Sequence, residues 1–181
     1  MQSDELTETL REAQRLGFFG DTPIEVAIEH ARQFVAALGA SCRSGRVLDL
    51  GSGGGLPGLV LAAELPDAQV VLLDRRRKRT DFLERAVSRL GFGHVDVWWQ
   101  DASRTATTVA RGEVESFDAV TARGFGPPEV TLRIAVACVR PSGCIVISEP
   151  PTGDRWPPQL LAGLGLESER RAGVRRFTFR S

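Results

Sequence analysis

The sequence predicts a three-layer α/β fold, in which a mostly parallel, twisted sheet carries helices on both faces. From residue 46 onward, short runs rich in Val, Leu and Ile alternate with longer amphipathic stretches, which is typical of parallel strands joined by crossover helices. The 181 residues are enough for one sizeable core and few for two. We therefore expect a single domain over 1–181, with a short helical N-terminal segment at 1–45 and the α/β core at 46–181.

Two helices are expected ahead of the sheet. Apolar residues recur at helical spacing in 4–16, and a second amphipathic stretch ends at Gly39. Thr22, Pro23 and Glu25 fit the start of this second helix as a capping hydroxyl, a first-turn proline and the glutamate of a capping box.

The elements of the core follow from the same alternation. Strands are expected at 46–50, 70–74, 94–99, 117–121 and 143–148, and helices at 57–64, 77–90, 103–110 and 127–139. A Trp- and Pro-containing segment from residue 156 and two short strand-like runs, the last at 175–180, follow them.

Composition limits the kinds of site and partner that we expect. The 23 basic and 23 acidic residues cancel, so any attraction for an anion must be local. The three cysteines lack metal-ligand spacing and only two histidines could join them, so no metal site is expected. The polar N-terminus does not resemble a signal peptide, and no apolar run reaches the length of a membrane span. We expect a cytoplasmic monomer.

A glycine-rich loop follows the first predicted strand. Gly51, Gly53 and Gly55 occupy alternate positions between that strand and the next helix, where glycine lets the backbone approach a ligand closely. Asp74 closes the second strand, at the place where a carboxylate accepts hydrogen bonds from ribose hydroxyls. Together these features predict a site for an adenosine-containing cofactor; the alternative is a turn that only packs helix against strand.

Two cofactors fit this loop. Gly53, Gly55 and Gly58 match the G-x-G-x-x-G fingerprint of dinucleotide sites. Asp49, however, stands two positions before Gly51, and its carboxylate would repel a pyrophosphate. S-adenosylmethionine carries a sulfonium and an ammonium group and no phosphate. Asp49 therefore favours the methyl donor over NAD, unless the residue serves only as a local cap.

Three segments resemble one methyltransferase family. They are "VLDLGSGGGLPGLVLA" from residue 47, "VVLLDRRRKRTDFLERA" from residue 70 and "FDAVTARGF" from residue 117. This combination is similar to the glucose-inhibited division protein B family, the RsmG-type methyltransferases, over about residues 25–148. The resemblance implies a Rossmann-like class I methyltransferase fold, S-adenosylmethionine as cofactor, and methylation of N7 of a guanine in small-subunit ribosomal RNA.

The resemblance also implies particular contacts. It places cofactor contacts at Gly51, Leu56 and Arg123 and, in a looser register, at Ser103 and Arg104. The general logic of the fold adds Asp101, which could accept from the adenine amino group or simply cap the following helix. The expected cofactor set is Asp49, Gly51, Gly53, Gly55, Leu56, Asp74, Asp101, Ser103, Arg104 and Arg123, and Arg123 is also the candidate catalytic residue.

The acceptor is less clearly encoded. The expected partner is 16S ribosomal RNA or the small ribosomal subunit, since guanine N7 has a free lone pair and demands no general base. The segment "EPP" at 149–151 stands where the family usually has a lysine-glycine pair, and could line the acceptor pocket. A small-molecule methyltransferase and a catalytically silent cofactor-binding interaction module remain alternatives.

Positive charge is concentrated in two places. Residues 75–79, "RRRKR", and the arginines of 170–180 could both contact RNA phosphates. Trp98 and Trp99 are consecutive in a predicted strand, so they must face opposite sides of the sheet and at least one should belong to the core.

Overall fold

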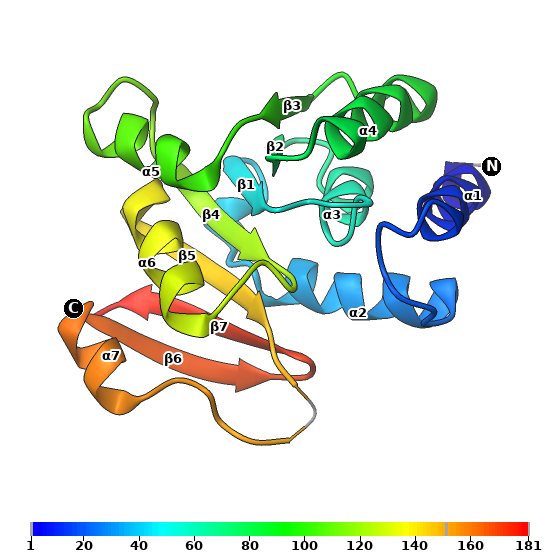
Figure 1. The fold of residues 1–181 in the computed structure, drawn as a ribbon. Helices are drawn as coiled ribbons and strands as arrows, with labels where there is room; N and C mark the ends of the chain where they lie inside the picture. Colours follow the sequence, from blue (N-terminus) through cyan, green and yellow to red (C-terminus); the bar gives the residue numbers. More distant parts are fainter. Residues whose placement is uncertain (1, 151, 181) are drawn as a thin grey trace.

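The computed structural model describes residues 2–150 and 152–180. Its seven-stranded sheet has the order β3-β2-β1-β4-β5-β7-β6 (Figure 1). The strands are β1 (Arg46–Leu50), β2 (Gln69–Asp74), β3 (Val95–Trp99), β4 (Phe117–Ala122), β5 (Val139–Ser148), β6 (Leu166–Arg171) and β7 (Val174–Phe179). The helices are α1 (Gln2–Arg15), α2 (Ile24–Ala37), α3 (Gly58–Glu64), α4 (Arg77–Leu90), α5 (Ala102–Ala110), α6 (Pro128–Cys138) and α7 (Pro158–Gly163), with a 3₁₀ turn at Ala40–Cys42.

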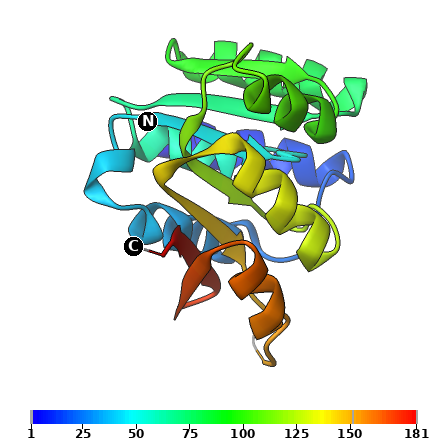
Figure 2. The same ribbon diagram turned by 90° about the vertical axis from the view of Figure 1, so that its left-hand side faces the viewer.

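The predicted fold class is confirmed. Strands β1 to β5 are parallel and β7 runs antiparallel to β5 and β6. Helices α1 to α4 cover one face of the sheet and α5 to α7 the other (Figure 1); with the latter face toward the viewer, α6 and α7 lie in front of the strands (Figure 2). No helix within 2–150 and 152–180 is long and apolar enough to cross a membrane.

Most predicted boundaries agree with the structure to within one residue, and two predictions were wrong. β5 begins at Val139 rather than near residue 143, because Val139 already pairs with Phe117 of β4. A register shift follows, with extra residues in β5 before Cys144 pairs with Ala119. Thr22 does not cap α2: Pro23 occupies the N-cap, and no side-chain hydrogen bond is made there.

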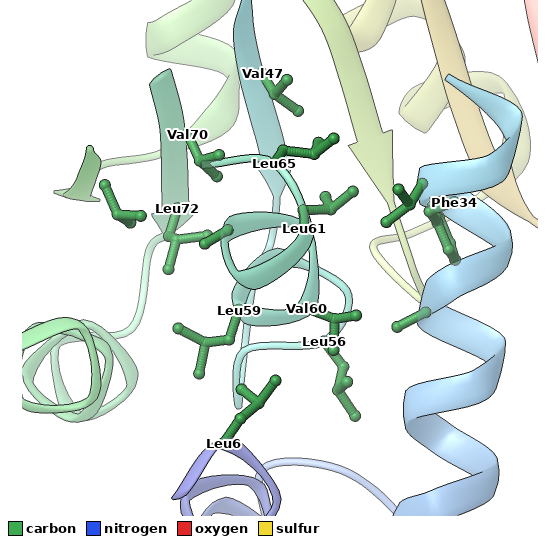
Figure 3. Close-up of a cluster of buried hydrophobic side chains, with 14 of the residues drawn as sticks. Leu6, Phe34, Val47, Leu56, Leu59, Val60, Leu61, Leu65, Val70 and Leu72 are labelled. Carbon is green, nitrogen blue, oxygen red and sulfur yellow. The ribbon is translucent and has the colours of Figure 1, made fainter. Parts of the chain in front are cut away.

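Two apolar clusters hold the layers together, one on each face of the sheet. On the α1–α4 face, the short helix α3 is the centre. Its residues Leu59 and Leu61 are fully buried and are surrounded by Leu6 of α1, Phe34 of α2 and Leu72 of β2 (Figure 3). Because α3 is packed on several sides, the glycine loop that leads into it is anchored at its end.

Candidate functional site

The predicted site residues converge at the carboxyl edge of the sheet. β2 and β4 lie on opposite sides of β1, where Asp49 is level with Leu72 of β2 and Thr121 of β4. The segments that leave these three strands therefore start next to one another. This is the position where the strand order reverses, and where open α/β sheets bind ligands.

The loop after β1 depends on glycine. Gly51, Gly53 and Gly55 all have positive φ, at 69°, 56° and 96°, a region that other residues enter only with strain. A Cβ atom on Gly51 would also lie 2.7 Å from the ring of Phe125. The loop can therefore bring bare backbone to a ligand.

Asp74 connects this loop to the end of β2. Its Oδ2 accepts a hydrogen bond from the backbone N–H of Gly53 at 3.0 Å, and its Oδ1 accepts from the N–H of Arg76 at 2.8 Å. Arg79 adds an ion pair, with its Nη1 3.5 Å from Asp74 Oδ2. The carboxylate is thus fixed in orientation beside the loop.

A cleft of about 410 Å³ opens in front of Asp74. We call it the adenosine cleft. Its walls include four residues of the expected cofactor set, Gly51, Asp74, Asp101 and Ser103, together with Phe125 and the loop after β4. Asp101 also caps α5, because its Oδ1 accepts from the N–H of Ser103 at 2.9 Å. Both readings of Asp101 are therefore compatible with the structure.

A second cavity of about 270 Å³ adjoins the cleft. We call it the glycine-loop cavity. It is lined by Gly51, Gly53, Leu56 and Arg123 of the expected set, and by Phe18 and Phe19 from the connection between α1 and α2. Gly51, Arg79 and Gly124 line both spaces, so one elongated ligand can span them.

Three residues of the expected set lie outside these walls. Asp49 is fully buried beneath the loop, Gly55 shapes the turn, and Arg104 is exposed on α5. Of the "EPP" segment, neither Glu149 nor Pro150 lines either space, and Pro151 lies outside the described residues. Glu149 instead accepts a hydrogen bond from the indole of Trp156.

Sequence reasoning missed Phe18, Phe19 and the placement of Arg79. The available signal was the pair of aromatic residues between two glycines, "GFFG" at 17–20, since large apolar side chains in a helix connection usually find a surface to cover. In the structure Phe18 packs edge-on against Phe82 of α4, with ring centroids 5.5 Å apart. This contact holds the connection over the glycine loop.

Asp49 and Arg123 form the charged floor of the site. Asp49 Oδ1 accepts from the hydroxyl of Thr121 at 2.8 Å. Burial raises the pKa of Asp49 to about 6. Hydrogen bonds from Thr121, from Ser52 and from the backbone of Gly58 oppose that rise, and the charge of Arg123 opposes it least. Burial lowers the pKa of Arg123, against the attraction of Asp49. Asp49 therefore places negative charge near Arg123, which lines the glycine-loop cavity.

This burial predicts an unusual dependence of stability on pH. The pKa of Asp49 rises from 3.8 to about 6 on folding, so between pH 4 and 6 the folded state binds more protons than the unfolded state. The free energy of unfolding contributed by Asp49 therefore falls as pH rises, by about 3 kcal/mol once pH 7 is reached. The asparagine side chain of Asp49→Asn does not titrate, so the stability of this variant lacks this dependence on pH.

Urea unfolding of both proteins at pH 4.5 and pH 7.5 measures the effect. We expect the stability of Asp49→Asn relative to the unmodified chain to improve by about 2 kcal/mol between the two pH values, because part of the titration lies below pH 4.5. A difference that does not change with pH would contradict the assignment of the raised pKa to Asp49.

Within residues 2–150 and 152–180, no group of three or more His, Cys, Asp or Glu residues is arranged to hold a metal ion. The three cysteines are buried and are not joined by disulfide bonds.

Comparison with known proteins identifies a family for this arrangement. The family model of the rRNA small subunit methyltransferase G (GidB) matches residues 21–149. A curated relative of that name from Sorangium cellulosum is 39% identical over 103 residues, which are 56% of this chain and 41% of the relative. One from Ralstonia nicotianae is 33% identical over 129 residues, 71% of this chain and 55% of the relative. The matched part thus spans about half the length of these relatives.

Solved structures support the fold. A putative O-methyltransferase from Klebsiella pneumoniae superimposes with a TM-score of 0.68 at 18% identity, covering 98% of this chain and 90% of that one. A SAM-dependent methyltransferase from Aquifex aeolicus gives a TM-score of 0.60 at 15% identity, with 93% and 96% covered. At these identities the likeness concerns the fold alone.

Proposed function

This chain belongs to the rRNA small subunit methyltransferase G family, and from that premise we propose that it transfers a methyl group from S-adenosylmethionine to N7 of a guanine in 16S ribosomal RNA. One observation carries the proposal. The adenosine cleft and the glycine-loop cavity join at Gly51, so an elongated cofactor whose adenosine part lies in the first can bring its methyl group into the second, where the acceptor meets it.

The residues present fit this cofactor. Asp74 is oriented by two backbone N–H groups to accept from ribose hydroxyls, and Asp101 and Ser103 lie where the adenine would reach. The buried Asp49 carboxyl adds negative charge beneath the glycine loop, which suits a cationic ligand and disfavours the pyrophosphate of NAD. S-adenosylmethionine supplies an electrophilic methyl group on a sulfonium. The main contribution of the protein is to position the acceptor in line with that methyl group.

The glycine-loop cavity suits a flat base. Phe18 and Phe19 line it and offer aromatic surface for stacking. Arg123 lines it as well, and its guanidinium can donate to O6 of a guanine while leaving N7 free to attack. No proton has to leave N7, so no general base is required.

The negative charge of Asp49 near Arg123 suits the movement of charge in this reaction. When N7 forms its bond to the methyl carbon, the carbon–sulfur bond breaks with its electrons on sulfur, and the positive charge passes to the guanine. A lone guanidinium would repel that charge. Asp49 lies close enough to offset part of the Arg123 charge, so the arginine can orient the base at a smaller electrostatic cost.

We further propose that the chain acts as a cytoplasmic monomer and a single domain, and that its partner is the small ribosomal subunit or its RNA. Residues Gly53, Gly55 and Leu56 shape the loop around the cofactor, and Ser103 and Arg104 begin the helix beside it. In this proposal Asp49 is a positioning residue, which acts through Arg123.

A tritiated-methyl assay tests the proposal against its alternatives. The chain is incubated with labelled S-adenosylmethionine and, separately, with small ribosomal subunits, naked 16S RNA and a metabolite extract. We expect label in RNA. Label in the metabolites alone would favour a small-molecule methyltransferase. Calorimetric binding of S-adenosylmethionine without any transfer would favour a silent module, and binding of NAD in its place would refute the cofactor assignment.

A further inference from the structure

A basic hollow of about 440 Å³ adjoins the site, between the end of α1 and the beginning of α4. We call it the α4 hollow. It is lined by Leu16, Gly17, Phe18, Arg76, Arg77, Lys78 and Arg79. Its wall thus contains four cationic side chains and no carboxylate. Because the whole chain carries equal numbers of basic and acidic residues, this is a local field.

Much of this charge is not neutralised within the protein. Arg77 pairs with Asp81 at 2.8 Å and Arg79 with Asp74 at 3.5 Å. Lys78 is exposed, and its side chain forms no ion pair among the described residues. A polyanion bound here would therefore be attracted electrostatically without first having to break an ion pair at every cationic side chain of the hollow.

The arginines near the C-terminus differ in this respect. Arg175 pairs with Glu149 at 3.6 Å and with Asp154 at 3.2 Å, and Arg171 pairs with Glu169 at 2.9 Å. The guanidinium of Arg170 donates to the carbonyls of Gly153 and Pro150. These side chains hold the tail and the loop after β5 in place, so the α4 hollow is the stronger candidate for binding a polyanion.

An exposed indole lies beside the α4 hollow. Trp99, at the end of β3, is 58% exposed. Its Nε1 donates to the carbonyl of Arg75 at 3.1 Å, and the Arg77 guanidinium lies 4.9 Å from its ring centroid. These contacts fix the orientation of the ring. A fixed aromatic face among cations is the combination that binds single-stranded nucleic acid, through base stacking and phosphate contacts.

The α4 hollow leads to the place of methyl transfer. Phe18 and Arg79 line both the hollow and the glycine-loop cavity. Resting on the proposed function, which makes RNA the acceptor, we propose that the α4 hollow and Trp99 bind the single-stranded RNA that flanks the target guanine. Phosphates contact Arg77 and Lys78, and one base stacks on Trp99.

Charge-matched double variants test this docking surface. Arg77→Gln/Lys78→Gln removes two cations that line the hollow but neither cavity of the site. Arg111→Gln/Arg133→Gln removes two exposed arginines from α6 and the end of α5. Binding of a fluorescent single-stranded 16S RNA fragment is followed by anisotropy over a range of salt concentrations.

We expect the first double variant to bind RNA about tenfold more weakly at low salt, and its salt slope to fall by about 1.4, as two lost phosphate contacts require. The second should stay within about twofold of the unmodified chain. Trp99→Ala should weaken binding about fivefold or more and leave the salt slope unchanged. In methyl transfer, the first double variant should raise KM for RNA without lowering kcat.

Three results would overturn the docking proposal: unchanged RNA binding by Arg77→Gln/Lys78→Gln, equal weakening by both double variants, or tighter binding of an acidic polypeptide than of RNA.

Calorimetry with S-adenosylhomocysteine distinguishes a failure of the docking proposal from a failure of the proposed function. Unaltered binding in the variants shows that the fold and the cofactor site are intact. Absence of binding in the unmodified chain would refute the proposed function, while the RNA titrations would still decide the role of the hollow.

Discussion

Replacing Arg123 with alanine is expected to lower kcat for methyl transfer about 100-fold or more, while the melting temperature changes by only a few degrees. The side chain lines the glycine-loop cavity and makes no hydrogen bond within the described residues, so little packing or bonding is lost. A misplaced acceptor, in contrast, is costly in a reaction that depends on positioning.

Arg123→Lys is the matched control for this prediction. It keeps the positive charge beside Asp49 but loses the planar, forked donor, so we expect intermediate activity with nearly unchanged stability. Steady-state kinetics and thermal unfolding on the same preparations separate the two effects. Parallel losses of kcat and of stability in Arg123→Ala would mean that the residue is structural.

Replacing Asp74 with asparagine is expected to raise the dissociation constant for S-adenosylhomocysteine about 10- to 100-fold. The carboxylate is 4% exposed, and the backbone N–H groups of Gly53 and Arg76 orient it. Losing one charge-assisted hydrogen bond to the ribose costs about 1.5–3 kcal/mol, and every 1.4 kcal/mol is tenfold in affinity.

Asp81→Asn is the control for Asp74→Asn. Asp81 lies on the following helix and pairs with Arg77, but lines neither the adenosine cleft nor the glycine-loop cavity. Calorimetry should therefore give an unchanged dissociation constant for this variant. An unchanged dissociation constant for Asp74→Asn itself would contradict the proposal that Asp74 binds the ribose.

The parts of the site that follow from local sequence could be predicted. The glycines after β1 and Asp74 after β2 follow directly from strand ends, and in a parallel sheet such ends meet at one edge. The pairing of Trp98 and Trp99 on opposite faces also follows from strand geometry: Trp98 contacts Phe117 in the core, and Trp99 is exposed.

The remaining parts depend on contacts between distant segments. Nothing in the sequence near Phe18 shows that the α1–α2 connection folds against α4, where Phe82 meets it. The burial of Asp49 could not be predicted either. Its position in the motif predicts a carboxylate near the ligand, but packing of the α2–α3 layer leaves this carboxylate completely buried. Tertiary packing also determines that β7 enters the sheet between β5 and β6.

The most direct test of the central claim is the identity of the methylated nucleoside. 16S RNA that has been labelled by this chain with tritiated S-adenosylmethionine is digested to nucleosides and separated by chromatography. The proposed function predicts that the label elutes with 7-methylguanosine and is lost in Arg123→Ala. Label in any other nucleoside, or equal labelling by Arg123→Ala, would contradict it.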